Sequence, residues 1–573
     1  MSTSSTSSTS GRAASGRRVL LSFLPGPGPA ALLALAVAAA TALPLAAPPF
    51  TRRFVDDAAA GASLDRLTPV ALGYLGLAVA GQAARMLTAW LAGRAAWDGS
   101  NRLRERLAGH TLGLDMAFHG GHTPGEMIER VDGDVAALTD FAVAFLLDVV
   151  GGALLLCGAV AVVFTVDPGI GGVLLAYCAV VGLGMICAQR LAVPSATRAR
   201  AASAALFGYL EERLAGAEDL RANGAGEHAV RRFYQASAAL WRAERRGDAV
   251  GSGILAATGA AFAAGTVLIP ALSGALGAGT AVLLLQYMLM VRTPFERLID
   301  QLRRYQAALA GLERIGDLLG ERSALPVPAA ARSLPATGPL ALELDAVGFA
   351  YGGEHGGEPV LRDITLSLAP GETLGLVGPS GSGKTTIARL VARLYDPASG
   401  AVRVGGLDLR EADPASLRSR IGVVNQDVRL FDADVRDNLT LFRPYPGDDR
   451  LREVLAEVGL AGWDLDARLG TVSAGEAQLL AFARVLLADP GLVVLDEAAG
   501  RLDPATERRV DRSVARLLSG RTGVLIAHRL ASLSRVDRIA VVSGGEIVEY
   551  GRRRDLLADP AGRFARMLAE ARR

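Results

Sequence analysis

The chain contains a single lysine, and the residues around it have the types and spacing needed to bind phosphate. Of the 60 lysine and arginine residues, all except Lys384 are arginine. The surrounding segment fits the pattern G-x-x-x-x-G-K-[ST] and consists of Gly378, Pro379, Ser380, Gly381, Ser382, Gly383, Lys384 and Thr385. Glycines let backbone N–H groups close around phosphate oxygens, and a slim ammonium fits between those oxygens where a planar guanidinium is too broad. A general bias toward arginine does not explain this exception, so we predict a nucleotide phosphate site here.

Three apolar runs have the composition of buried parallel strands, and each is followed by residues that can do chemistry. The runs are 373–377, 491–495 and 523–527. The first leads into the phosphate loop, and Thr385 and Thr386 then open a helix whose N-terminus favours anions. The second is followed by Asp496 and Glu497, and the third by His528. Because ligands gather at the carboxyl ends of strands in an open α/β sheet, we expect these side chains to converge.

These side chains suit the hydrolysis of a bound nucleotide. Thr385 and Asp496 offer oxygen ligands to Mg²⁺, Glu497 can polarise an attacking water, and His528 can reach a γ-phosphate. An acidic pair or a histidine after a strand is a weak signal alone, because many strands end in acids and such histidines are commonly structural. The phosphate loop therefore carries the prediction.

Long apolar segments dominate the first half of the chain. Apolar residues make up 51% of the sequence, and the mean hydropathy is +0.31. A helix needs about 20 predominantly apolar residues to cross a bilayer. We predict six spans, approximately Ala30–Ala47, Pro69–Ala92, Phe141–Val163, Ile170–Val193, Val250–Ala271 and Leu276–Val291. The last two are separated only by residues 272–275, so their boundary is soft.

The placement of arginine predicts the orientation of these spans. Residues 94–131 and 190–246 are dense with arginine, whereas the loops near residue 167 and over 269–278 contain no basic residue. Because positive loops stay in the cytoplasm, we expect both termini to be cytoplasmic in a multi-pass protein of the cell membrane, the bacterial inner membrane. Arg52 and Arg53 go against the rule, but Asp56 and Asp57 adjoin them. The first apolar segment could be a signal peptide, but the further spans favour a first membrane helix.

The two long cytoplasmic loops have helical periodicity with a break in the middle of each, at 119–126 and 222–227. A helix–break–helix hairpin would present its tip to a cytosolic domain, and a plain solvated loop is the alternative. Two ionisable residues lie inside spans, Arg85 in the second and Asp148 in the third. Because such residues are costly and often functional, we expect them to pair or to line a polar cavity, unless Arg85 reaches the interface.

These features divide the chain into four parts. We predict a disordered leader over 1–18, a helical transmembrane domain of six spans over 19–320, a linker over 321–338, and an α/β P-loop domain over 339–573. The net charge of +2 produces no strong positive electrostatic field over the whole protein, so nucleic acid is not an expected partner. The three cysteines lie in apolar stretches and suggest no disulfide framework.

With these motifs in this order, the chain resembles the ATP-binding cassette (ABC) exporters, as a half-transporter with one six-helix domain fused to one nucleotide-binding domain. The resemblance covers nearly everything after residue 17. It implies that Tyr351 stacks on adenine, that Gln426 links Mg²⁺ and the attacking water to the transmembrane domain, and that ATP and Mg²⁺ bind the phosphate loop. It also implies the Mg²⁺-site, catalytic and switch roles for Asp496, Glu497 and His528. The breaks at 119–126 and 222–227 match the coupling helices.

The chain departs from the family pattern in the segments that contact a partner's ATP. The signature Leu-Ser-Gly-Gly-Gln appears as Val472, Ser473, Ala474, Gly475 and Glu476. Ser473 and Gly475 are kept, whereas Ala474 adds a methyl group and Glu476 adds a negative charge near phosphate. The Ser-Ala-Leu-Asp loop keeps only Leu502 and Asp503. Since in the resembled family each ATP lies between one subunit's loop and the other's signature, an intact loop with an altered signature favours a heterodimer over a homodimer.

The resemblance implies ATP-driven alternating access, with export of a small molecule, a lipid or a peptide. One alternative is an importer of a metal-chelate ligand built on the same fold. Another is an ATP-gated channel or sensor, but the presence of Gln426, Glu497 and His528 favours turnover. The apolar spans contain few aromatic residues and indicate no particular substrate.

Overall fold

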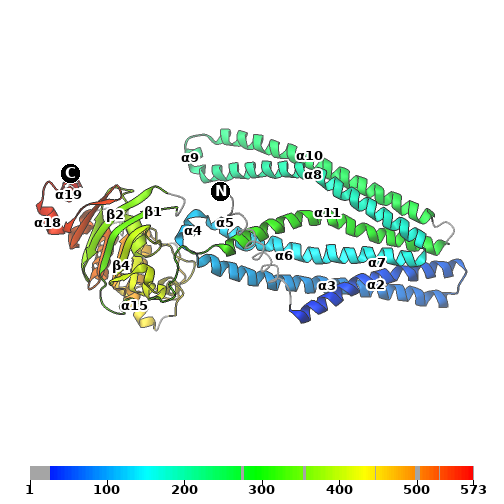
Figure 1. Cartoon of the computed structure of the whole chain (residues 1–573), viewed down its shortest axis with the longest axis horizontal. Helices are drawn as coiled ribbons and strands as arrows, with labels where there is room; N and C mark the ends of the chain where they lie inside the picture. The colour runs from blue at the N-terminus through cyan, green and yellow to red at the C-terminus, as the bar shows by residue number, and fades with distance from the viewer. Residues whose placement is uncertain are drawn as a thin grey trace, which may run out of the picture. The chain divides into compact units, whose positions relative to one another are not determined.

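The computed structural model describes residues 26–571, apart from 273–276, 353–356, 445–446, 471, 497–503 and 528–529. The chain forms two compact units. One comprises residues Met1–Leu112 and Pro124–Glu321, and the other comprises Gly113–Thr123 and Arg322–Arg573. Figure 1 shows the first as long helices and the second as a mixed α/β domain.

The first unit is helical throughout its described residues. Its elements are α2 (Pro27–Ala59), α3 (Leu64–Leu112), α5 (Pro124–Ile128), η1 (Glu129–Gly133), α6 (Asp134–Ala144), η2 (Phe145–Val150), α7 (Gly151–Val166), α8 (Pro168–Ala215), α9 (Ala217–Ala222), α10 (Gly226–Leu272) and α11 (Ala278–Gly320). The sharp turn between α7 and α8 follows from local chemistry. Pro168 is the first residue of α8, and Asp167 caps the helix by accepting hydrogen bonds from the N–H groups of Gly169 (2.8 Å) and Ile170 (2.9 Å).

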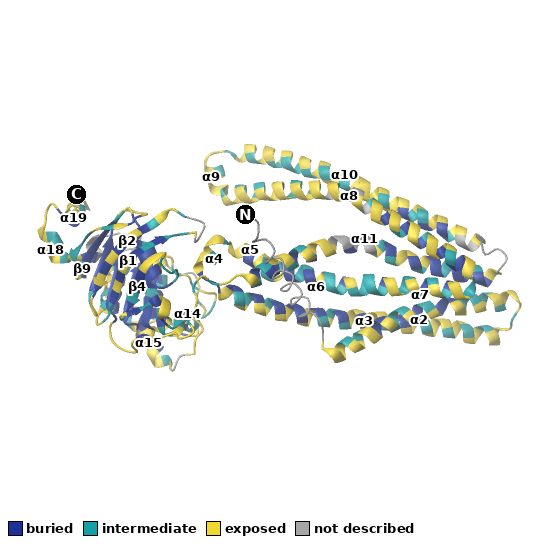
Figure 2. Ribbon diagram, viewed as in Figure 1, coloured by how far each residue is buried: buried dark blue, intermediate teal, exposed yellow. Residues whose placement is uncertain are grey.

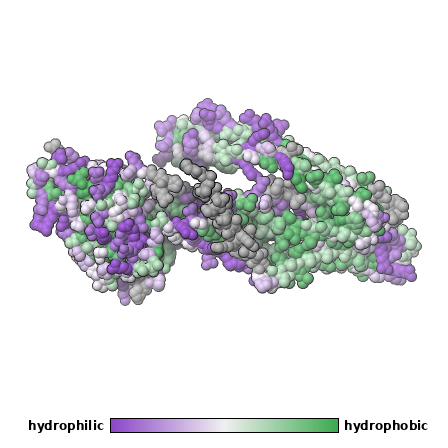
Figure 3. Space-filling model, in the orientation of Figure 1, coloured by the Kyte–Doolittle hydropathy of each residue, from purple (hydrophilic) through white to green (hydrophobic). Residues whose placement is uncertain are grey.

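Among the described residues, five helical stretches are long and apolar enough to cross a membrane: Pro27–Ala59, Leu64–Leu112, Pro124–Val166, Pro168–Ala215 and Gly226–Leu268. Large apolar side chains on them point outward, including Leu35, Val79 and Val180. Figure 2 shows exposed residues along the outer faces of these helices, and Figure 3 shows hydrophobic surface over the same region. The sixth expected span begins at Leu276, outside the described residues, and continues into α11, so it stays a prediction.

Several of these helices are longer than a bilayer is thick. The 48 residues of α8 correspond to about 72 Å at about 1.5 Å per residue, whereas a hydrocarbon core is about 30 Å thick. Both expected breaks are present. The first separates α4 (Met116–Gly121) from α5, and the second separates α9 from α10.

The second unit is built on two sheets. A six-stranded sheet has the order β10-β9-β3-β8-β7-β6, and a four-stranded sheet has the order β2-β1-β4-β5. The strands are β1 (Leu342–Ala350), β2 (Pro359–Leu368), β3 (Thr373–Val377), β4 (Ser399–Val404), β5 (Leu407–Asp408), β6 (Ile421–Val424), β7 (Leu492–Asp496), β8 (Thr522–Ile526), β9 (Arg538–Ser543) and β10 (Glu546–Arg552). In the larger sheet β9, β3, β8, β7 and β6 are parallel to one another, and β10 pairs antiparallel with β9. Every residue of β3, β7 and β8 is buried, which confirms the expected buried parallel strands.

Helices cover the larger sheet and complete the core. They are α12 (Lys384–Val391), α13 (Pro414–Arg420), α14 (Val435–Thr440), α15 (Asp448–Glu457), α16 (Ala474–Ala488), α17 (Pro504–Leu518), α18 (Arg553–Ala558) and α19 (Arg563–Ala571). One apolar core joins residues of β7 and β9 to α14, α15, α16 and α17. The other core joins the smaller sheet to the larger sheet and α12. The parallel strands are thus packed against an apolar core on each face of the sheet.

Candidate nucleotide site

The parallel sheet brings most of the predicted motifs to one edge. β3, β8, β7 and β6 are consecutive neighbours, with Leu376 opposite Ile526 and Val424 opposite Leu495. The phosphate loop follows β3, Asp496 ends β7, and Gln426 comes two residues after β6. Because parallel strands carry their carboxyl ends to the same edge, the expected convergence is present for the phosphate loop and Asp496, and Gln426 joins them there.

Two glycines of the phosphate loop combine a positive φ with neighbouring atoms that leave no room for a Cβ. Gly378 has φ 150°, and a Cβ there would lie 2.0 Å from the carbonyl oxygen of Val542. Gly383 has φ 103°, and a Cβ would lie 2.5 Å from Cδ2 of Leu361. Both conformations are ones that side chains rarely adopt. Gly383 directly precedes α12, so the loop delivers the backbone N–H groups of the first turn of α12 to the edge.

Lys384 is held inside this loop. The residue is only 5% exposed. Its Nζ donates hydrogen bonds to the carbonyl oxygens of Gly378 (2.9 Å) and Pro379 (2.8 Å), and to Oγ of Ser382 at 3.4 Å. The ammonium is therefore oriented by the backbone of the loop itself. A compact ammonium with three donors fits this space, whereas the planar guanidinium of an arginine does not.

Tyr351 lies in an aromatic cluster beside α12. Its ring meets those of Phe349 and Tyr395 edge to face, with centroids 4.9 Å and 5.3 Å away. Its hydroxyl lies 3.1 Å from Oγ1 of Thr386 and accepts a hydrogen bond of 3.1 Å from Nη1 of Arg389. The half-buried ring is thus fixed next to the phosphate loop and offers a flat apolar surface to a base.

The oxygen-bearing residues at the edge suit a hard cation. Asp496 is the last residue of β7 and is only 6% exposed. A buried carboxylate is stabilised by a bound cation, and Mg²⁺ prefers oxygen ligands. Gln426 is exposed at the same edge, and Thr385 lies in the first turn of α12. This donor set fits Mg²⁺.

Three predicted residues lie outside the described residues. They are Glu497, Asp503 and His528. Glu497 directly follows the last residue of β7, and His528 comes two residues after the end of β8. Their catalytic and contact roles therefore stay predictions.

The altered signature forms the start of α16, and its acid has a local partner. Ser473 caps the helix in a reciprocal capping box with Glu476. Oε2 of Glu476 accepts hydrogen bonds from the Ser473 backbone N–H (2.9 Å) and hydroxyl (2.8 Å). These hydrogen bonds, led by the one from the backbone, lower the pKa of Glu476. The carboxylate thus keeps its charge at this helix N-terminus and engages the Ser473 hydroxyl, which the resemblance assigns to a partner's phosphate.

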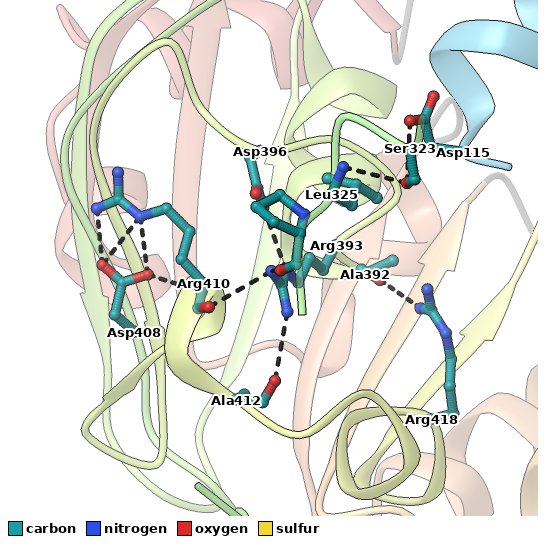
Figure 4. Close-up of polar contacts among 11 residues, drawn as sticks. Asp115, Ser323, Leu325, Ala392, Arg393, Asp396, Asp408, Arg410, Ala412 and Arg418 are labelled. Carbon is teal, nitrogen blue, oxygen red and sulfur yellow. Dashed lines mark hydrogen bonds and ion pairs between the residues drawn. The ribbon is translucent and has the colours of Figure 1, made fainter. Parts of the chain in front are cut away.

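A polar junction that was not predicted from the sequence joins α4 to the α/β domain (Figure 4). Asp115 caps α4 through the N–H groups of Ala117 and Phe118, and its other oxygen accepts from Ser323 Oγ at 3.1 Å and from the N–H of Ala324. Burial acts to raise the pKa of Asp115, but these hydrogen bonds outweigh it and hold the pKa below its usual value. The helix that leads into the first break, α4, is therefore attached to the domain, whereas most residues of the break itself, 120–126, are exposed.

Two further side chains complete this junction. Tyr395, which touches the ring of Tyr351, donates a hydrogen bond of 3.2 Å to the carbonyl oxygen of Met116 in α4. Arg393, only 5% exposed, bonds to Asp396 and to the carbonyl oxygens of Pro326 (3.1 Å) and Ala412 (3.3 Å). Neither residue belongs to a recognisable motif, and their role depends on contacts between segments far apart in the sequence.

The first unit contains a cavity of about 470 Å³ that both Arg85 and Asp148 line. Asp148 accepts hydrogen bonds from Arg297 (2.7 Å) and Gln301 (2.8 Å), whereas Arg85 bonds to Gln82. The two predicted residues thus line the same cavity, and the hydrogen bonds just described go to other partners rather than to each other. Pro44, Gly152, Leu155 and Met290 supply apolar walls.

Comparison with known proteins identifies the chain. Residues 361–500 match the ABC transporter family, and residues 31–295 match the ABC transporter transmembrane region. The fold is similar to a solved bacterial Atm1-family ABC exporter with ATP bound, with a TM-score of 0.79, 22% identity, and 95% and 98% of the two chains covered. The chain belongs to the ABC transporters. As an exporter-type half-transporter, it is an ATP hydrolase that drives transport across a membrane.

Two curated relatives illustrate the range of this family. An uncharacterized ABC transporter ATP-binding protein of Bacillus subtilis, YknV, is 29% identical over 475 residues, or 80% of this chain and 78% of the relative. The ATP-dependent lipid A-core flippase of Burkholderia pseudomallei is 37% identical over 292 residues, or 49% of this chain and 48% of the flippase. The family match and the exporter-type fold favour an exporter over an importer or a gated channel.

Proposed function

We propose that this ABC half-transporter exports its substrate by alternating access as one half of a dimer in the bacterial inner membrane, with both termini in the cytoplasm. The observation that supports its ATP site best is the shared edge of β3, β8, β7 and β6, where the phosphate loop, Asp496 and Gln426 meet. The cavity lined by Arg85 and Asp148 is the proposed space for the substrate, a small molecule, a lipid or a peptide.

In this proposal each described side chain positions the nucleotide. Tyr351 stacks on adenine, the backbone N–H groups of residues 380–386 bind phosphate, and Lys384 leaves its loop carbonyls to meet phosphate oxygens. Thr385, Gln426 and Asp496 would hold Mg²⁺, which neutralises phosphate charge when bound. Glu497 polarises the attacking water and His528 stabilises charge on the γ-phosphate, because phosphoryl transfer depends on positioning and electrostatics.

A second half-transporter completes each site. Ser473, Ala474, Gly475 and Glu476 would face the partner's ATP, together with Asp503. Since the phosphate loop of this chain is intact and its signature is altered, we propose a heterodimer rather than a homodimer. Closure of the nucleotide-binding domains would move α4 through its junction with Asp115 and Tyr395.

The catalytic assignment is tested by Glu497→Gln. The amide keeps the size of the side chain but does not polarise water, so we expect ATP affinity within about twofold of wild type and hydrolysis reduced about 100-fold or more. Radiolabelled ATP binding and phosphate release measure the two quantities. Glu546→Gln, an exposed change on β10, is the matched control. Hydrolysis near the wild-type rate in Glu497→Gln would show that another residue is the base.

A further inference from the structure

A second pocket in the helical unit lies between α8 and α10 and is strongly basic. Its volume is about 240 Å³, and it is lined by Ser195, Arg198, Ala239, Arg242, Ala243 and Arg246. These two helices lie side by side along the hairpin in Figure 1. Figure 3 shows hydrophilic surface along the end of this hairpin that carries α9.

The charges of this pocket are not balanced by protein. The three arginines are exposed, no ion pair of theirs is found within the described residues, and Nε of Arg242 donates to the carbonyl oxygen of Ala238, at 3.0 Å. Glu244 and Asp248 lie nearby on α10 but do not line the pocket. Arginines four residues apart on a helix, such as Arg242 and Arg246, repel each other, so an anion in this space would reduce that repulsion.

The expected position of the pocket relative to the membrane indicates where such an anion would come from. Arg198 comes five residues after Val193, where the fourth span is expected to end, and Arg246 comes four residues before Val250, where the fifth begins. At about 1.5 Å per residue these offsets are about 6 to 8 Å. The headgroup layer on each side of a hydrocarbon core is about 5 to 8 Å thick, so the arginines lie at the level of lipid phosphates.

We propose that this pocket binds the phosphate of an anionic phospholipid. Guanidinium groups form paired hydrogen bonds with phosphate oxygens, and the three arginines approach the pocket from two helices. Basic pockets between membrane helices bind such headgroups on the cytoplasmic side. The assignment to the cytoplasmic leaflet rests on the proposed orientation, whereas the site itself does not depend on export or on ATP.

The test compares two double variants that each remove two positive charges. Arg198→Gln/Arg242→Gln alters the pocket, and Arg231→Gln/Arg232→Gln alters exposed arginines further along α10 that do not line it. The full-length protein is placed in phosphatidylcholine nanodiscs with and without phosphatidylglycerol. Native mass spectrometry counts retained phosphatidylglycerol, and a titration gives its apparent Kd without nucleotide. We expect the pocket variant to lose affinity about tenfold or more and the control to stay within about twofold.

A third variant and a soluble probe decide between the remaining explanations. Arg198→Lys/Arg242→Lys keeps the charge but not the paired geometry, and we expect an intermediate loss. Equal losses in both Gln variants would indicate diffuse attraction and overturn the site. Displacement of the lipid by millimolar inorganic phosphate would show that the pocket takes a soluble anion instead. ATP hydrolysis in each variant is recorded separately, so failure of the proposed transport function would not be mistaken for failure of this site.

Discussion

At the scale of single residues, the capping box of α16 changes the meaning of the altered signature. The sequence predicts that the charge of Glu476 weakens phosphate binding, and this stays a prediction. The hydrogen bonds from Ser473 add a second effect, because the hydroxyl expected to reach a partner's phosphate already donates to Oε2 of Glu476. The acid therefore stabilises its own helix, and it would compete with a partner's phosphate for Ser473 if the signature faces that phosphate as proposed.

Glu476→Gln separates these two effects. Glutamine can keep the capping box, so α16 should remain capped, while the negative charge near the helix N-terminus disappears. We expect the apparent ATP affinity of the assembled dimer to rise about two- to fivefold, in line with about 0.3 to 1 kcal/mol for one charge at a helix end. Equilibrium binding of a slowly hydrolysed ATP analogue measures this change. An unchanged affinity, with normal thermal unfolding, would mean that Glu476 does not face phosphate.

At the scale of the elements, the junction around α4 gives a prediction about local stability. Asp115→Ala removes the cap of α4 and the bonds to Ser323 and Ala324, which costs about 1 kcal/mol or more locally. We expect hydrogen exchange over residues 116–121 to accelerate about fivefold, with the core strands unchanged. Asp115→Asn keeps an acceptor for the cap and should show a smaller effect. Equal exchange in all three proteins would contradict a structural role for this cap.

The same carboxylate gives the junction a defined pH dependence. Because the pKa of Asp115 is lower in the folded than in the unfolded state, its contribution is complete above the unfolded value of about 3.9. The contribution is lost as the pH falls through the folded pKa. Wild-type exchange over residues 116–121 should therefore approach that of Asp115→Ala only in strong acid. Convergence of the two proteins already near pH 6 would assign the effect to another group.

The elements also show what the sequence could predict. Composition and flanking motifs were enough to predict β3, β7, β8 and the phosphate loop. Buried parallel strands and a glycine-rich loop depend mainly on the residues of the segment itself. Both breaks in the arginine-rich loops, at 119–126 and 222–227, were also predictable from the local sequence. The contacts of Asp115, Arg393 and Tyr395 were not, since each joins segments that are distant in sequence. The hydrogen bonds that Arg297 and Gln301 donate to Asp148 could not be predicted either, because they depend on the packing of α11 against η2.

At the scale of the whole molecule, the difference between the loop and the signature predicts the composition of the dimer. A homodimer would contain two identical sites, each joining an intact loop to a signature with an extra methyl group and a competing acid. A heterodimer would give this chain's loop a competent signature from its partner. We therefore expect the chain purified alone to hydrolyse ATP slowly and to dimerise weakly with ATP, although its own loop binds the nucleotide.

A variant in which the family signature is restored tests this prediction directly. Ala474→Gly/Glu476→Gln recreates Ser-Gly-Gly-Gln, and Gly475 and Ser473 stay in place. If the signature limits self-association, this variant should form an ATP-dependent homodimer and hydrolyse ATP about tenfold faster than wild type, because each γ-phosphate regains its contacts. Light scattering and phosphate release measure both effects, and Glu497→Gln in the same background should abolish the gain. A wild-type chain that alone forms a stable, rapidly hydrolysing dimer would establish the homodimer, since its altered signature would then be fully competent.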